Sequence, residues 1–228
     1  VILIILSICI YIVISNNKKQ RQLFEYAYID PITKKGNIYY LRKKGQEIIE
    51  KRKPKEIELK QYIVVLDINK FKLINKAYGY KVGDIILKGI AEEIENLLGK
   101  ESLICRLSND YFAALFEFKE NIHYMLEKMV RHIENLKVGD TAYNLSTNIG
   151  VYKLTNGDRN ISEIMDRAIM AHSASKGDVF EKFRIFDEKI EKELDKESKI
   201  EHEMYQALKD KEFKVFYQPK FNAKEETL

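Results

Sequence analysis

The most constraining feature of this chain is a nearly uninterrupted apolar run, Tyr62–Ile68, which reads YIVVLDI. A strand that is apolar on both faces needs cover on both sides, as a central strand has in an α/β sheet. Its one charged residue, Asp67, lies near the end of the run. The chain therefore needs helices on two sides of a sheet. Apolar residues at helical spacing predict them at Ile38–Arg52, Gly83–Leu98, Ile122–Leu136 and Ile161–Ser173.

Further strands are predicted around this run. Leu103–Leu107 and Tyr111–Phe118 flank Ser108-Asn109-Asp110, and Asn and Asp tolerate the positive φ of a hairpin turn. Asn144–Lys153 and Phe183–Phe186 also read as strands. The order strand, helix, hairpin, helix, strand predicts an α/β (α+β) fold with a ferredoxin-like core, in which helices flank a central, mostly antiparallel sheet.

The N-terminus carries a second apolar run, Val1–Ser15, which has no charged residue. It is shorter than the roughly 20 residues of a spanning helix, and the alternatives are a signal-peptide core or a buried strand or helix. A signal peptide carries its positive charge before the apolar run, whereas here Lys18, Lys19 and Arg21 follow it. We therefore predict the C-terminal part of a transmembrane helix over 1–15, which begins before Val1, and a juxtamembrane linker helix over 16–29.

Basic residues after a span favour the cytoplasmic side. We therefore expect the protein at the inner (cell) membrane, with the membrane as a partner and the globular part in the cytoplasm. Hydrophobic residues make up 45% of the chain, which excludes a mostly disordered protein. The net charge is only +4 and no basic stripe is visible, so we expect no nucleic-acid partner.

Two carboxylates suggest a cation site. Asp67 precedes a turn whose free N–H groups suit a metal-bound phosphate chain. The simpler alternative is that Asp67 only caps the next helix. If the hairpin pairs beside the central strand, Asp110 approaches Asp67. Two carboxylates from adjacent strands then form a cation site of the kind that nucleotidyl-transfer enzymes use.

Several motifs in order resemble the GGDEF family of diguanylate cyclases. The segment LDINKFKLINKAYGYKVGDIIL is similar to the family's D-x-D-x-F-K-x-x-N-D…G-D-x-x-L stretch. DPITKKGN resembles the opening D-x-L-T-G-L-x-N, and RLSNDYF falls at R-x-G-G-D-E-F. The resemblance covers about Phe24–Asp187, and we assign 30–187 to a degenerate GGDEF domain. Looser matches are Asn148–Val151 and Asp166–Gly177.

The resemblance implies a set of site residues. Asp67 and Asp110 would be metal carboxylates for Mg (or Mn), with the Ile68 carbonyl as a third ligand, and Asp110 would be catalytic if the domain is active. GTP would be the ligand, and the family implies a homodimer. The nucleotide-binding residues would be Phe71 and Lys72 on the phosphate turn, and Asn75 and Asp84 on the guanine edge. The simpler alternative for the last two is a helix cap and a turn.

The signature departs from the family. Ser108 and Asn109 replace both glycines, which puts two side chains where the family leaves bare backbone. Tyr111 replaces the acidic Glu, and Asn69 replaces the second Asp of D-x-D. These losses predict poor catalysis.

Two other positions differ. The family's late lysine aligns with Ser173, although Lys176 can substitute after a small shift. Gly99 and Ser102 occupy the inhibitory R-x-x-D site, so we expect no product feedback. The four histidines are scattered and are expected at surface or partly buried positions.

The C-terminal part is predicted to connect to a second domain. Residues 188–211 are strongly charged with interleaved apolar residues, which predicts a connecting helix, and Phe213–Gln218 reads as a strand. Ile200–Phe221 resembles the start of an EAL domain, the cyclic-di-GMP phosphodiesterase. By that resemblance 212–228 begins a truncated EAL domain, Gln218 contacts cyclic-di-GMP, and no phosphodiesterase activity resides in this fragment.

Three functions follow. The first, which we favour, is a cyclic-di-GMP signalling protein whose GGDEF domain binds GTP and Mg and regulates an attached EAL phosphodiesterase. The second is an active diguanylate cyclase that joins two GTP molecules. The third is a dimerisation scaffold without nucleotide.

Overall fold

The computed structural model of the protein describes residues 2–52, 60–139, 141–176 and 181–217, with side chains from residue 9 onward. The chain divides into two compact units, Val1–Asp187 and Glu188–Leu228, and each is described by itself.

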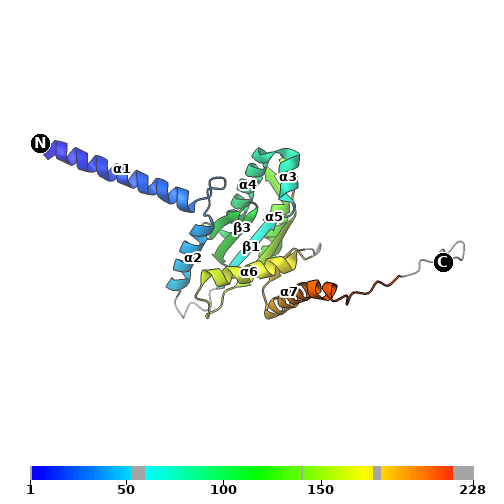
Figure 1. The fold of residues 1–228 in the computed structure, drawn as a ribbon. Helices are drawn as coiled ribbons and strands as arrows, with labels where there is room; N and C mark the ends of the chain where they lie inside the picture. Colours follow the sequence, from blue (N-terminus) through cyan, green and yellow to red (C-terminus); the bar gives the residue numbers. More distant parts are fainter. Residues whose placement is uncertain (1, 53–59, 140, 177–180, 218–228) are drawn as a thin grey trace. The chain divides into compact units, whose positions relative to one another are not determined.

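The first unit is built on a five-stranded sheet in the order β2-β3-β1-β6-β7 (Figure 1). The central strand β1 pairs antiparallel with β3 and with β6, while β7 pairs parallel with β6. The predicted central, mostly antiparallel sheet flanked by helices is confirmed. The strands are β1 Gln61–Ile68, β2 Leu103–Ser108, β3 Tyr111–Glu117, β6 Thr147–Lys153 and β7 Phe183–Ile185.

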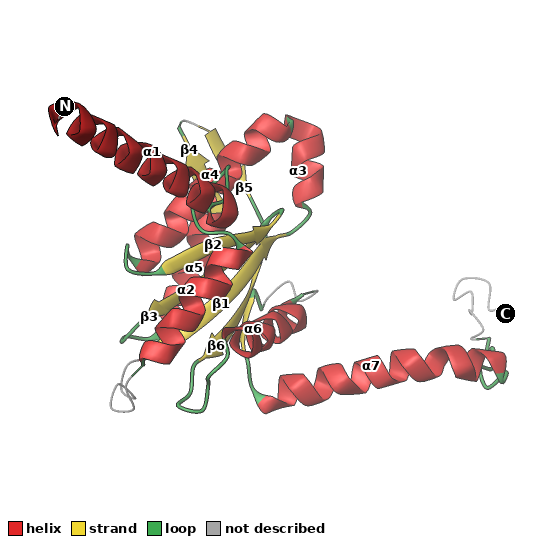
Figure 2. Ribbon diagram, turned by 60° about the vertical axis from the view of Figure 1, so that its left-hand side comes forward, coloured by secondary structure: helices red, strands yellow, loops and turns green. Residues whose placement is uncertain are grey.

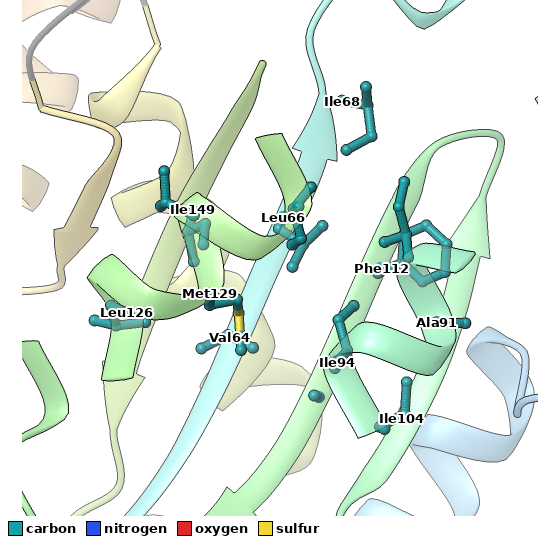
Figure 3. Close-up of a cluster of buried hydrophobic side chains, with 14 of the residues drawn as sticks. Val64, Leu66, Ile68, Ala91, Ile94, Ile104, Phe112, Leu126, Met129 and Ile149 are labelled. Carbon is teal, nitrogen blue, oxygen red and sulfur yellow. The ribbon is translucent and has the colours of Figure 1, made fainter. Parts of the chain in front are cut away.

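Alternation along β1 decides what each face of the sheet contacts, because successive side chains point to opposite faces. Val64, Leu66 and Ile68 enter one core, where residues of α4 and α5 cover them (Figure 3). Ile63 and Val65 enter the other core, which α2 and α6 cover. Asp67 has the parity of Ile63 and Val65, so its carboxylate faces the α2 and α6 side.

The helices of the first unit follow the predicted order. Asn37, Asn121 and Asn160 accept backbone N–H bonds at the first turns of α2, α5 and α6, which fixes where these helices begin. The helices are α1 Ile2–Tyr28, α2 Ile38–Lys51, α3 Phe71–Tyr78, α4 Tyr80–Leu98, α5 Ile122–Glu134 and α6 Ile161–Ser175.

Two features were not predicted. The first is that α3 and α4 are separate helices, because Gly79, at φ 86°, interrupts the helix between them. A second hairpin follows α5, made of β4 Asn135–Val138 and β5 Thr141–Asn144. The helix predicted over Ile122–Leu136 extended two residues into β4, because the apolar Leu136 continues the helical spacing.

The predicted membrane span is wrong. Within the described part of the chain, no helix combines the length and the apolar character that crossing a membrane requires. The helix α1 has 27 residues, but its uncharged part ends before Lys18. The predicted location at the cell membrane rested on that span and is wrong as well.

The second unit contains α7, Glu188–Lys209, where the charged run predicted a helix. Phe213–Tyr217 has no regular secondary structure, so the strand predicted there is wrong for these five residues. Gln218, the predicted cyclic-di-GMP contact, lies outside the described residues.

Candidate nucleotide site

The strand pairing brings the two predicted acidic residues together. Leu66 pairs with Phe112 across β1 and β3, so the turn between β2 and β3 lies beside the end of β1. Asn109 occupies the left-handed region at φ 40°, a conformation that Asn tolerates at hairpin turns. Asp110 follows it and therefore lies next to Asp67 and Ile68.

The charge of Asp67 acts on the neighbouring carboxyl of Asp110. Burial raises the pKa of Asp110, and the charge of Asp67 raises it further, while a backbone hydrogen bond from Ile68 and the charge of Lys176 lower it by less. The pKa of Asp110 therefore lies above its ordinary value. Two carboxylates that repel each other in this way form a pair that favours a neighbouring positive charge.

Asp67 already has nitrogen partners at both carboxylate oxygens. Its side chain is 7% exposed, with Oδ2 2.8 Å from Lys176 Nζ and Oδ1 3.1 Å from His172 Nε2. The His172 contact has hydrogen-bond distance without hydrogen-bond alignment, so we count it as an electrostatic contact. Burial alone would raise the pKa of Asp67, but His172 and Lys176 together hold it below its ordinary value.

The close packing of α6 on β6 explains how two residues of one helix reach Asp67 (Figure 2). A Cβ atom at Gly150 of β6 would lie 2.5 Å from the Cα of His172, and closer still to the carbonyl oxygen of Ala168. Only glycine allows this approach. The side chain of Asn148, which pairs with Asp67 across the strands, also donates to the Ser175 carbonyl at 2.6 Å.

Tyr111, which stands at the position of the family's Glu, takes part in the same cluster. Its hydroxyl accepts a hydrogen bond from Lys176 Nζ at 2.8 Å, and its ring meets His172 edge-on with centroids 5.2 Å apart. Although burial lowers the pKa of Lys176, its contacts with Asp67 and Tyr111 raise it above the ordinary value. Lys176 is therefore an ammonium at neutral pH.

The hairpin turn is also fixed from outside the sheet. Arg106 Nη1 lies 3.1 Å from Asp30 Oδ2, and Arg106 Nε donates to the Asn109 carbonyl at 2.6 Å. Asp30 in turn accepts from the backbone and hydroxyl of Thr33. These bonds join the motif DPITKKGN to the motif RLSNDYF. They set the orientation of the turn that carries Asp110.

The predicted guanine-edge residues lie close together. Asn75 of α3 is half-buried, and a Cβ atom at Gly83 of α4 would lie 3.1 Å from its Cγ and closer to its Oδ1. Asp84, also half-buried, is the next residue of α4. Among the described residues, no donor bonds the buried Oδ1 of Asn75. A buried oxygen without a donor is a polar group that still needs a hydrogen-bond partner.

The two predicted phosphate-turn residues differ from each other. Phe71 is 7% exposed, and its ring packs in the core with α4. Lys72 is exposed at the start of α3. Its ammonium is therefore accessible to an anion, while the ring of Phe71 is not accessible to a ligand.

A resident divalent cation does not fit the site as it is folded. Oxygen ligands such as Asp67, Asp110 and the Ile68 carbonyl are of the type that Mg²⁺ prefers. However, nitrogen atoms of His172 and Lys176 already face the two carboxylate oxygens of Asp67. In the ranges that the structure describes, no three His, Cys, Asp or Glu side chains gather into a metal site.

Sequence reasoning missed His172 and left Lys176 as an alternative to Ser173. His172 is 1% exposed, so its assignment to a surface or partly buried position is wrong. The signal that could have found both is Gly150: a glycine in a central strand often marks a close approach of another backbone. The residues on the facing helix are then the neighbours of the strand's acid.

Comparison with known proteins gives a consistent result. A family model described as "Diguanylate cyclase, GGDEF domain" matches residues 27–182. The bifunctional diguanylate cyclase/cyclic di-GMP phosphodiesterase MucR of Pseudomonas aeruginosa is 25% identical over 206 residues, which are 89% of this chain and 30% of MucR. The signaling protein YkoW of Bacillus subtilis is 25% identical over 216 residues, or 92% of this chain and 27% of YkoW. The chain thus spans less than a third of these relatives.

A solved structure shares the fold. The coiled coil and GGDEF domain of DgcB from Caulobacter crescentus, in complex with c-di-GMP, matches with a TM-score of 0.64 and 21% identity, covering 79% of this chain and 96% of that one. Since the family model matches more than half of the chain, this protein belongs to the GGDEF, or diguanylate cyclase, domain family.

Proposed function

We propose that residues 30–187 form a GTP-binding regulatory domain in cyclic-di-GMP signalling, one that does not itself make cyclic-di-GMP. The observation that carries the proposal is a contrast between the two ends of the site. At one end Asn75 of α3 lies against Gly83, the residue before Asp84, with its buried oxygen unbonded. At the other end Tyr111 holds Lys176 against Asp67.

The first end supports purine binding. An amide from α3 and a carboxylate from α4 offer a donor and acceptors to the guanine edge, and adenine presents a different pattern. Lys72 is exposed on the first turn of α3, three residues before Asn75, and supplies a positive charge for the phosphates.

The second end argues against turnover. Joining two nucleotides needs charge stabilisation at the reacting phosphorus and placement within fractions of an ångström. Tyr111 removes an acidic group from the signature, and Ser108 and Asn109 add side chains where the family has bare backbone.

We further propose that the bound nucleotide regulates an attached phosphodiesterase. Residues 188–211 would connect to an EAL domain that begins at 212–228, with Gln218 as a cyclic-di-GMP contact. MucR carries both activities in its name, and another relative, NbdA of Pseudomonas aeruginosa, is named a cyclic di-GMP phosphodiesterase.

Calorimetric titration of the full chain with GTP, with and without Mg²⁺, tests the proposal. We expect Asn75→Ala and Asp84→Ala each to weaken GTP binding by about tenfold, since one lost hydrogen bond to a charged or buried partner is worth roughly 1.4 kcal/mol. Lys88→Ala, an exposed change on α4, is the matched control. ATP should bind more weakly than GTP. If millimolar GTP produces no heat, the proposal fails, and the scaffold function is left.

An active cyclase, working as a face-to-face homodimer, is the second candidate. The retained acid pair Asp67 and Asp110, coupled through their charges, favours it. It predicts cyclic-di-GMP formation from GTP that Asp110→Asn abolishes.

A further inference from the structure

The cation in this site is part of the chain. Lys176 Nζ lies 2.8 Å from Asp67 Oδ2 and donates to the Tyr111 hydroxyl at 2.8 Å. It also lies 5.3 Å from the centroid of the Tyr111 ring, over its face. Three contacts from two strands therefore fix the ammonium where a metal ion would approach Asp67.

The end of α6 is anchored in this position. Lys176 is the C-cap of α6, and its backbone N–H bonds the Ser173 carbonyl. The preceding residue, Ser175, is bonded through its carbonyl to the buried Asn148 of β6 and through its hydroxyl to the His172 carbonyl. Because the helix end is tied to the sheet, the lysine stays within reach of Asp67.

A divalent ion would meet two obstacles. His172 Nε2, itself 1% exposed, lies 3.1 Å from the second oxygen of Asp67, so nitrogen atoms face both oxygens. An ion that used Asp110 instead would stand next to the ammonium and be repelled by it. The oxygen ligands for a metal ion are present, but the Lys176 ammonium already supplies the positive charge that would balance their negative charge.

Since Lys176 occupies the cation position, we infer that it replaces the divalent metal in this domain and that the pocket takes its purine nucleotide without Mg²⁺. The inference rests on the proposed GTP binding for its ligand, but the exclusion of metal stands on the contacts that Lys176 and His172 make with Asp67. Lys176 is thus a specificity-determining residue, and Tyr111 positions it.

The test uses Mn²⁺ alone, measured by the loss of the free-ion paramagnetic resonance signal, on the full chain. The unaltered protein should bind no Mn²⁺ up to roughly 1 mM. Lys176→Met should bind it at least about tenfold more tightly, because Asp67 and Asp110 are then uncompensated. Lys153→Met, an exposed lysine at the end of β6, is the control and should behave as the unaltered protein. Lys176→Gln serves if the Met variant does not fold, as circular dichroism reports.

Two results overturn the inference: Mn²⁺ binding by the unaltered protein that Asp67→Asn abolishes, or no gain of Mn²⁺ binding in both Lys176 variants. A second measurement compares GTP binding in EDTA with binding in Mg²⁺. We expect dissociation constants within about twofold of each other, and a gain of tenfold or more from Mg²⁺ contradicts the inference. Absence of GTP binding in both buffers refutes the proposed function, and the Mn²⁺ results then still decide the role of Lys176.

Discussion

The substitution Gly150→Ala tests the contact on which the whole site depends. The added Cβ would lie 2.5 Å from the Cα of His172, whereas ordinary contact begins at 3.4 Å, so α6 must retreat by about 1 Å or more. The colliding atoms belong to the backbone of Ala168 and His172, so no side-chain rotamer relieves the clash. Overpacking of this kind costs about 1–3 kcal/mol, and we expect about 3 kcal/mol here because two residues of one helix collide.

Urea unfolding, followed by circular dichroism and tyrosine fluorescence, measures this effect. With a slope of about 2 kcal/mol per molar urea, a loss of about 3 kcal/mol lowers the midpoint by roughly 1.5 M. The matched control is Gly157→Ala, where the nearest atom to the new Cβ is Thr155 Oγ1 at 3.8 Å. It should change stability by less than about 0.5 kcal/mol. If both variants unfold at the same urea concentration, the close approach of α6 does not hold the site together.

Three further predictions concern other parts of the first unit. Asp30→Ala leaves Arg106 without its carboxylate and should destabilise the protein by about 3 kcal/mol in the same urea assay, because both side chains are largely buried; an effect below 0.5 kcal/mol would contradict this. Gly83→Ala should abolish calorimetric GTP binding while leaving the fold intact by circular dichroism, since the new methyl would push Asn75 out of place; unchanged affinity would count against Asn75 as a ligand. Burial raises the pKa of Cys105 to about 12, so Ellman's reagent at pH 8 should label only the exposed Cys9 at once and Cys105 only after unfolding; two fast thiols in the native protein would refute that burial.

Much of the fold follows from β1. Its unbroken apolar pattern requires two covered faces, and its parity assigns Asp67 to the face that α6 covers. The hairpin turn at Asn109 and the pairing of Asp110 beside the strand follow from turn chemistry. The covered strand and the hairpin turn are local features, so residue types alone were enough to predict them, whereas the face on which Asp67 lies was read only from the structure.

What failed depended on tertiary packing. Lys176 reaches Asp67 because α6 extends to Ser175 and is tied to Asn148, and sequence alignment placed the family's lysine at Ser173 instead. The ring of Phe71 lies in the core because α3 packs on α4, and the phosphate-turn motif gave no indication of that packing. The apolar run at the N-terminus was interpreted as the end of a membrane span. In the structure it belongs to one helix with the charged residues from Lys18 onward.

Equilibrium dialysis of the full chain against GTP, followed by chromatography of the nucleotides in both chambers, tests the central claim most directly. The account predicts excess GTP on the protein side, in proportion to the protein, and intact GTP in both chambers. Cyclic-di-GMP that accumulates with the protein and disappears in Asp110→Asn would contradict it, as would equal GTP on the two sides.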